Sequence, residues 1–534
     1  PFPHFILTFP FHIPISPISL SRNMETILTP EDLPSWERLD DERFTFNLER
    51  ACNVAGDQRK FLYHPDFKAK LTSTLVSRWD SSSSSMHSTA LRLIRILCRD
   101  EDGVSSLLSK PFLQLAVESS GLPALCEADI PREEREEAIK CLINALFRLQ
   151  VARRVFLEKK GDVGLTTALA KEGEEEEMRY LLLHLAFIVS ATERDAQNSW
   201  RDDITMLSSL LREAREWKKS DRNANESLKV LFNIFCHARG LSGNYNITRV
   251  VAEQVVTTCV EILLTAPNEG ELIQNTVNLF ATVPLYGEIV FPFVEKRCKN
   301  VNIYGNRDMT CARIVLDDLS AKLQVAKESE LALIGTYLTV LINMSTNCKE
   351  ARRFLRLEIL PPLHAKDVER PPELGDTMRN KLVRVMQSTS QSRELAAEFL
   401  YVLCKRSVNR LIKYTGLGHS AGLLANSGLL GRINEGKRAS DSEDSETEDY
   451  KTVEDQVNPV TGYMRGEKTN VFEGMTEEQK EYEAMKLVEQ MDKMLSTGII
   501  KPGTIGPDGR LKEVSHVLEL TKNVKTPEGS DSDS

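Results

Sequence analysis

The sequence lacks most signatures of secreted and membrane proteins. Its ten cysteines include no CxxC pair and stand singly, mostly in apolar runs such as RILCRD and YVLCKR. This pattern is typical of reduced, buried thiols in a cytosolic protein. No run reaches the roughly 18 apolar residues that a transmembrane helix needs. We therefore expect a cytoplasmic protein without a transmembrane segment, with recruitment to the cell cortex as a further expectation.

Motifs for catalysis, nucleotide binding and metal binding are also scarce. There is no GxxxxGK[ST] and no HExxH, and the nine histidines show no metal-ligand spacing. We expect no cofactor, no metal and no covalent catalysis. One catalytic pattern does match, because GHSAG at 418–422 fits G-x-S-x-G. A nucleophile elbow needs a strand before the serine, whereas these flanks are helical in pattern. A helix-breaking turn at Ser420 is the preferred interpretation, and a hydrolase stays open as an alternative.

Charge and the N-terminal segment set further bounds. The formal net charge of −10 argues against nucleic acid as a partner. Residues 1–23 contain five prolines and no basic region before the apolar stretch, which argues against a signal peptide. We interpret 1–23 as a non-native or disordered extension ahead of the folded region.

A repeat dominates residues 24–430. Apolar residues recur at helical spacing, with Gly and Pro mainly between the periodic runs. Similar helices recur about 43 to 49 residues apart, centred on Arg95, Asn144, Phe187, Asn233 and Asn278. This is the period of armadillo and HEAT repeats. It predicts an all-α fold, a solenoid superhelix in which the last helix of each unit lines a concave groove. A longer gap before Asn343 contains EKRCKNVNIYGNRD, which we expect to be a loop.

Polar residues within these apolar helices are candidates for ligand binding. An asparagine amide there either bonds to the backbone of a neighbouring repeat or faces the groove and holds a peptide. For any single asparagine neither interpretation is preferred. For the whole set, the regular period favours the interpretation in which the amides face the groove. Arg95 and Arg99 are four residues apart and are expected on one helix face. They would suit a carboxylate ligand, with a solvated face as the alternative.

The composition changes after Leu430. Residues 431–475, including SDSEDSETEDY at 440–450, are polar and acidic, and we expect a flexible linker. Residues 476–497 are predicted to form an amphipathic helix, which begins at a capping box of Thr476 and Gln479. Its apolar stripe consists of Met485, Val488, Met491 and Leu495. This helix docks either on its own solenoid or on a partner. Residues 498–534 are expected to be a disordered tail.

Several strings together resemble one family. They are RNKLVRVM at 379–386, AAEFLYVLC at 396–404, IKYTGLGHSAGLLANSGL at 412–429, VNPVTG at 457–462 and EGMTEEQKEYEAMKLV at 473–488. They are similar to the synembryn family, cytosolic chaperones and guanine-nucleotide exchange factors for heterotrimeric Gα subunits. The similarity is dense over about residues 340–495 and weaker but collinear from about residue 90. The family fold, an armadillo/HEAT superhelix, agrees with the period.

The resemblance implies exchange by binding. The Gα C-terminal helix would lie in the concave groove, and the helix near residues 476–497 would contact Gα near its switch regions. Matched by motif, the groove residues are Arg95 and Arg99 of RILCR, Asn144 of LIN, Phe187 of LAFIV and Phe232 of LFN. The partners would be Gα subunits without βγ, and we expect a monomer. An armadillo-type adaptor without exchange activity remains the alternative.

The acidic stretch is a candidate for phosphorylation. Ser440 and Ser445 each have a glutamate at +3, which acidophilic casein-kinase-type kinases favour. The resemblance places the family's two phosphorylated positions on the same serines. Arginine suits phosphate, and two basic groups are candidate docking sites: Arg352, Arg353 and Arg356, and Lys405, Arg406 and Arg410. A solvated acidic spacer is the alternative.

Overall fold

The structure is a computed structural model of the whole chain. It describes residues 33–55, 65–122, 129–238, 245–266, 270–295, 302–325, 331, 333–433, 447–464, 475–483, 485–486, 503–505 and 511–513. The expected extension at 1–23 lies outside the described residues. The chain divides into two compact units, Pro1–Pro284 and Leu285–Ser534.

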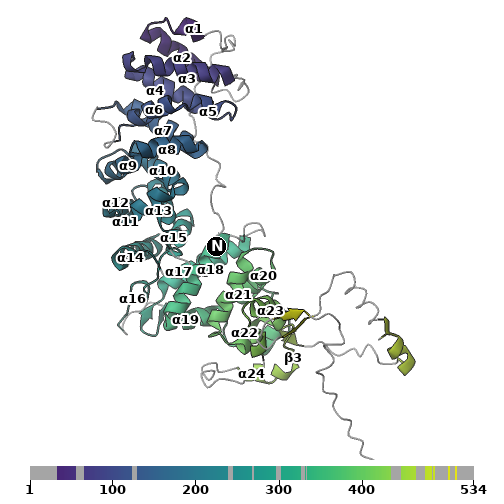
Figure 1. Cartoon of the computed structure of the whole chain (residues 1–534). Helices are drawn as coiled ribbons and strands as arrows, with labels where there is room; N and C mark the ends of the chain where they lie inside the picture. Colours follow the sequence, from purple (N-terminus) through teal and green to yellow (C-terminus); the bar gives the residue numbers. More distant parts are fainter. Residues whose placement is uncertain are drawn as a thin grey trace, which may run out of the picture. The chain divides into compact units, whose positions relative to one another are not determined.

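The first unit consists of helices stacked in sequence order (Figure 1). Helix α2 packs on α4, α4 on α7, α7 on α10, α10 on α13, and α13 on α15. We call α4, α7, α10, α13 and α15 the helix ladder. The ladder confirms the predicted armadillo/HEAT-like repeat. The helices of this unit are α1 (Leu33–Trp36), α2 (Asp41–Ala55), α3 (Pro65–Arg78), α4 (Ser84–Leu97), α5 (Val104–Leu107), α6 (Lys110–Ser119), α7 (Arg132–Arg148), α8 (Gln150–Glu158), α9 (Gly161–Ala170), α10 (Glu176–Thr192), α11 (Arg194–Asp202), α12 (Ile204–Arg215), α13 (Asp221–Phe235), α14 (Arg249–Thr265) and α15 (Gly270–Phe280), with the 3₁₀ turn η1 (Trp79–Ser81).

Local sequence explains where these helices begin and which side they bury. Ser83 caps α4 by accepting a hydrogen bond from the Met86 amide, and Asp203 caps α12 by accepting from the Thr205 and Met206 amides. Such caps satisfy amide groups that have no partner inside the helix. The apolar residues of α4, at helical spacing, are fully or almost fully buried. Burial of this stripe on both neighbours holds each repeat in the stack.

The second unit is also helical. Helix α18 packs on α19 and α21, and α20 packs on α21. Its elements are α16 (Gly287–Val290), β1 (Ile303–Tyr304), β2 (Arg307–Asp308), α17 (Thr310–Val325), α18 (Gly335–Asn347), α19 (Lys349–Ile359), η3 (Ala365–Val368), α20 (Met378–Gln387), α21 (Ser392–Leu403), α22 (Val408–Thr415), α23 (Leu417–Asn426), η4 (Leu430–Arg432), α24 (Glu448–Lys451), η6 (Glu454–Gln456), β3 (Val457–Asn458), β4 (Tyr463–Met464), β5 (Gly503–Ile505) and β6 (Leu511–Glu513).

The insertion that was expected to be a loop contains a hairpin. Strands β1 and β2 are antiparallel, with Tyr304 opposite Arg307. Gly305 and Asn306 between them both have positive φ, 58° and 62°. Two left-handed residues are what a two-residue hairpin turn requires, and Gly and Asn adopt that conformation at low cost. The Gly-Asn pair was the sequence signal for this turn.

The predicted flexible linker at 431–475 differs from the structure over residues 447–464, which fold onto the second unit. The ring of Tyr450 in α24 is only 3% exposed, and the Lys413 ammonium lies 4.2 Å from its centroid. The Asp449 carboxylate accepts a hydrogen bond of 3.0 Å from the Ala365 amide. A buried aromatic ring and a paired carboxylate anchor this part of the chain.

The hairpin β3–β4 packs on the start of α23, so the VNPVTG and GLGHS strings lie together. The amides of Leu417 and Gly418 donate to the carbonyl oxygens of Pro459 and Val460, at 2.8 and 2.9 Å. Gly416, before α23, has φ 78°, and a Cβ there would lie 2.8 Å from the Thr461 carbonyl carbon. Only glycine fits both the conformation and the close approach.

The expectation of a helix-breaking turn at Ser420 is wrong. Ser420 lies inside α23, is fully buried, and donates its hydroxyl hydrogen to the Gly416 carbonyl at 3.1 Å. The turn is at Gly416 instead, because glycine tolerates the positive φ. A serine held within a helix has none of the exposed strand-to-helix geometry that a nucleophile elbow needs.

None of the eight cysteines within the described part of the chain forms a disulfide bond, and seven of them are buried. Burial raises the pKa of the Cys52, Cys98 and Cys311 thiols to about 12, so these thiols stay protonated at neutral pH. Across the described residues, every helix is too short or too polar to span a lipid bilayer.

Candidate functional site

The helix ladder carries the predicted groove residues on consecutive helices. Arg95 lies on α4, Asn144 on α7, Phe187 on α10 and Phe232 on α13. Since each of these helices packs on the next, residues far apart in sequence belong to one continuous layer. Arg99 departs from the prediction, because α4 ends at Leu97 and Arg99 follows the C-cap residue.

Arg95 is already paired within the protein. Its Nε and Nη2 atoms lie 3.0 and 2.9 Å from Oε2 of Glu137 on α7. The residue is only 8% exposed. A buried charge that has a partner on the next repeat first of all joins the two repeats. Of the two arginines expected to suit a carboxylate ligand, Arg95 is thus already bound to a carboxylate of the protein itself.

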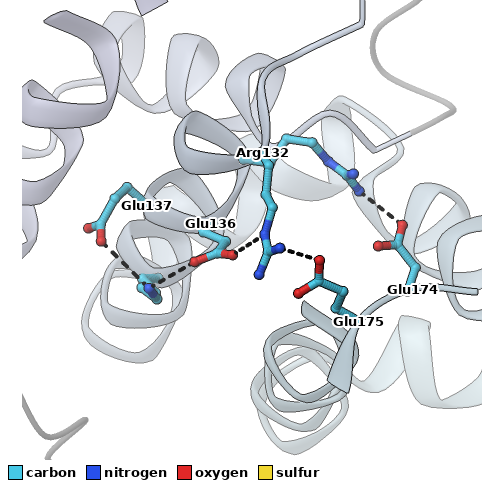
Figure 2. A network of polar contacts seen from close by, with 7 residues as sticks. Arg132, Glu136, Glu137, Glu174 and Glu175 are labelled. Carbon is cyan, nitrogen blue, oxygen red and sulfur yellow. Dashed lines mark hydrogen bonds and ion pairs between the residues drawn. The ribbon is translucent and has the colours of Figure 1, made fainter. Parts of the chain in front are cut away.

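Glu137 belongs to a longer network of charges, shown in Figure 2. Lys140 lies 3.6 Å from Glu137 and 3.5 Å from Glu136, and Glu136 also accepts from Arg132 at 2.8 Å. Arg132 then pairs with Glu175, just before α10. The network thus extends from α4 through α7 to the residue before α10.

Arg99 has a guanidinium with no hydrogen-bond or ion-pair partner among the described residues. Burial, and then the nearby positive charge of Arg95, lowers the pKa of Arg99. Both effects disfavour the charged form, and a bound anion would relieve both. The segment that holds Arg99 is fixed by Lys68, which is fully buried and donates to Oδ2 of Asp100 at 3.0 Å. Arg99 therefore stays a candidate for binding an anionic ligand.

The two interpretations of the asparagines apply to different residues. The Asn233 amide donates to the Ser190 hydroxyl of the neighbouring helix at 3.0 Å, as the structural interpretation predicts. Asn278 accepts from Gln274 on its own helix at 3.0 Å. The half-buried side chain of Asn144 has no hydrogen-bond partner in the described ranges. The side chain of Asn343 on α18 likewise has no hydrogen-bond partner there, so among the periodic asparagines of the helix ladder Asn144 stays a candidate for binding a ligand.

Phe187 and Phe232 are both partly exposed. The Phe187 ring stacks on the His184 ring with a centroid distance of 6.0 Å, and His184 stacks on Tyr180 at 5.6 Å. This row of aromatic rings lies along α10. Its exposed end, at Phe187, offers apolar surface of the kind that a bound helix or extended peptide requires.

Sequence reasoning missed the polar pairs that join successive ladder helices. Each pair links residues about one repeat apart, so a search for opposite charges at the repeat period could have found them. Examples are His87 with Glu134 at 3.1 Å, Arg222 with Glu177 at 2.8 Å, His184 with Glu226 at 3.1 Å and Lys229 with Glu271 at 3.3 Å. The ladder is held together by charge as well as by its apolar core.

The second unit brings four of the six predicted phosphate-docking residues into one pocket. This basic pocket has a volume of about 330 Å³ and is lined by Tyr304, Arg352, Arg353, Arg356, Leu357, Leu403 and Lys405. The sequence suggested two separate groups, but α19 packs on α21 and Lys405 follows α21, so the groups merge. Arg406 is exposed and Arg410 is buried, and neither lines the pocket.

The predicted C-terminal helix is described only at its start. Thr476 and Gln479 form the expected capping box, with each side chain accepting from the other residue's amide at 3.3 and 3.1 Å. Residues 477–483 and 485–486 are helical, and Met485 is 71% exposed. Val488, Met491 and Leu495, together with Ser440 and Ser445, lie outside the described residues.

Comparisons with known proteins identify relatives over most of the chain. A family model described as guanine nucleotide exchange factor synembryn matches residues 90–510. "Chaperone ric-8" of Caenorhabditis elegans is 37% identical over 508 residues, which cover 83% of this chain and 88% of that protein. "Chaperone Ric-8A" of Danio rerio is 32% identical and covers 83% of this chain and 87% of its own. Among solved structures, a designed armadillo repeat protein in complex with a (KR)4 peptide superposes with a TM-score of 0.34 at 14% identity, over 47% of this chain and 98% of its own, a likeness too low to carry an argument.

Proposed function

The chain belongs to the synembryn family, and from this premise we propose that it is a chaperone and guanine-nucleotide exchange factor for heterotrimeric Gα subunits. The C-terminal helix of Gα binds along the ladder, over Arg99, Asn144, Phe187 and Phe232. Arg95 supports this site through its pair with Glu137. The single observation that carries the proposal is that the side chains of Arg99 and Asn144, at the end of α4 and on the next ladder helix, lack partners among the described residues.

Each group has a defined role in that binding. Arg99 takes the terminal carboxylate or an acidic side chain of the Gα tail, since its desolvated guanidinium gains most from an anion. The Asn144 amide bonds to the peptide backbone. The two phenylalanines cover the apolar side chains of the bound helix.

Exchange follows from differential binding. A protein that binds nucleotide-free Gα more tightly than GDP-bound Gα shifts the population toward the empty state and lets GDP leave. The apolar stripe of Met485, Val488, Met491 and Leu495 contacts Gα near its switch regions and adds to this difference. GTP then favours the other conformation of Gα and releases the complex. The proposal requires no acid, base or metal.

Phosphorylation regulates the second unit in this proposal. Ser440 and Ser445, phosphorylated by an acidophilic casein-kinase-type kinase, dock in the basic pocket. Arginine forks bind phosphate with charge-assisted bonds worth about 1.5–3 kcal/mol each. Docking would hold the acidic segment against α19 and so position the helix that follows it. Charge reversal of Arg352 and Arg353 to glutamate should make phosphorylation ineffective in raising melting temperature and exchange rate.

The test is uptake of a GTP analogue by purified Gα with the full-length protein, the Arg99→Ala variant, and a chain truncated at residue 470. Arg99→Ala should weaken both tail-peptide binding and exchange. The truncated chain should retain peptide binding and exchange poorly. If the full-length protein binds the Gα tail peptide without accelerating GDP release, the molecule is an armadillo-type peptide adaptor instead.

A further inference from the structure

A second pocket lies in the first unit, away from the proposed Gα site. It has a volume of about 330 Å³, and we call it the acidic pocket. It is built from the segment before α10, the first turns of α10 and α13, and the end of α12. Its lining includes Glu172, Gly173, Glu174, Glu176, Arg179, Arg212, Glu213, Glu216, Lys219, Ser220 and Asn223. Phe187 follows the pocket residue Glu176 by 11 positions on α10, and Phe232 follows Asn223 by nine positions on α13. At 1.5 Å per residue these separations are roughly 17 and 14 Å along the helix axes.

One buried side chain of this pocket has no partner. Asn223 is 4% exposed, and its Oδ1 atom accepts no hydrogen bond from any described residue. Its backbone amide is used by the Ser220 cap, but the side-chain amide is not used. An amide buried without a partner costs free energy that a bound donor would recover.

A second buried atom needs an acceptor. Arg212 uses Nη1 to bind Glu172 at 3.1 Å, whereas its Nη2 is buried and has no acceptor within the described residues. The adjacent Arg179 is fully used, by Glu213 at 3.2 Å and by the Leu169 and Lys171 carbonyls at 2.7 Å. The pocket lining thus includes one buried acceptor, Oδ1 of Asn223, and one buried donor, Nη2 of Arg212, that have no partner among the described residues.

The charge of the lining selects the ligand. Five glutamates line the pocket against three cationic residues. Glu176 accepts from the Ser220 hydroxyl at 2.7 Å, and no cationic group pairs with it among the described residues. The pocket therefore disfavours anions such as phosphate and favours a positive charge next to Glu176.

We propose that the acidic pocket binds a basic peptide segment of a partner protein. A lysine or arginine side chain meets Glu176, the peptide N–H donates to Oδ1 of Asn223, and the peptide carbonyl accepts from Nη2 of Arg212. A free polyamine supplies the positive charge but no acceptor, so Arg212 would stay unsatisfied. A peptide backbone supplies both an N–H donor for Asn223 and a carbonyl acceptor for Arg212, so a peptide is favoured over a polyamine. This site is separate from the one proposed for the Gα tail.

The test is calorimetric titration of the full chain with a capped peptide of sequence GRKRG, at several salt concentrations. Glu176→Lys should weaken binding roughly tenfold and flatten the salt dependence, since a charge contact is reversed. Asn223→Leu should weaken binding while leaving the salt dependence unchanged. The control is Glu177→Lys, which changes the net charge equally on the same helix turn but does not line the pocket. Because Glu177 pairs with Arg222, thermal melting of both variants confirms that they are folded.

Several outcomes would overturn the proposal. Equal losses in Glu176→Lys and Glu177→Lys would mean diffuse attraction to an acidic protein. Displacement of the peptide by spermidine at equal concentration would mean that only charge is recognised, as in a polyamine site. Binding of the Gα tail peptide serves as the independent readout and should stay unchanged in both Glu176→Lys and Asn223→Leu, which separates this proposal from the function proposed above.

Discussion

The guanidinium of Arg95 and the carboxylate of Glu137 form a 2.9 Å ion pair between α4 and α7, with side chains only 10% and 13% exposed. Arg99, two residues beyond the end of α4, has no such partner among the described residues. Two arginines four residues apart therefore have different roles. One joins neighbouring repeats, and the other is the one that we propose binds a ligand.

This difference predicts separate effects of substitution. Arg95→Gln should lower the free energy of unfolding by about 1.5–3 kcal/mol, because it removes the charge-assisted bonds to Glu137 and leaves that carboxylate only its 3.6 Å contact with Lys140. Arg99→Gln should leave stability nearly unchanged and weaken binding of a Gα tail peptide about tenfold. Urea unfolding and calorimetric titration measure the two quantities. A tail affinity that is unaffected by Arg99→Gln would remove this residue from the site.

Asn144 on α7 and Asn233 on α13 offer a comparison between two helices of the ladder. Asn144→Ala removes an amide with no partner in the described structure and should weaken tail-peptide binding about ten- to a hundredfold with little effect on melting. Asn233→Ala removes the 3.0 Å hydrogen bond to Ser190 and should cost about 1 kcal/mol of stability. If Asn144→Ala instead lowered stability and Asn233→Ala weakened peptide binding, Asn144 would not be the asparagine that binds the peptide.

Two glycine-to-alanine substitutions in the GLGHSAG segment, at 416–422, should have opposite effects on stability. Gly416→Ala adds a methyl group 2.8 Å from the Thr461 carbonyl carbon at φ 78°, so the hairpin β3–β4 must move away from α23. The strain of the positive φ alone is about 1–2 kcal/mol. Gly422 lies within α23 with nothing within 4 Å of an added Cβ, and Gly422→Ala should stabilise by about 0.5–1 kcal/mol. Thermal melting of both variants checks the prediction.

The anchor of α24 should depend on pH in the acidic range. The Ala365 amide, followed by the Thr447 hydroxyl, lowers the pKa of Asp449 from 3.8 to about 2. Because the folded pKa is depressed, the stabilisation is present above about pH 4 and is lost as the pH falls toward about 2. Asp449→Asn should therefore lower the melting temperature at pH 6 and have no effect near pH 2. If the melting temperatures of Asp449→Asn and the unmodified protein differed by the same amount at both pH values, titration of Asp449 would not account for the pH dependence.

The repeat period and the apolar spacing predicted the ladder, since each repeat must bury its stripe on its neighbours. The capping box at Thr476 was also predictable, because both partners lie within one helix turn. The strings VNPVTG and GLGHS identified the family, but their contact through Gly416 was not readable from either string. Local patterns specify contacts within a turn or a repeat, where the geometry of one helix fixes the distances.

Which polar groups have hydrogen-bond partners depends on the tertiary fold. Asn144 and Asn233 have the same type of sequence context, yet one has no partner in the described chain and the other bonds to Ser190. Likewise Arg95 is paired across repeats, and Lys405 joins Arg352 in one pocket. Residues 447–464 have the polar composition of a spacer, but in the structure Tyr450 is buried. The physical reason is that hydrogen bonding and burial depend on which side chain faces which across an interface, and a linear sequence does not specify that pairing.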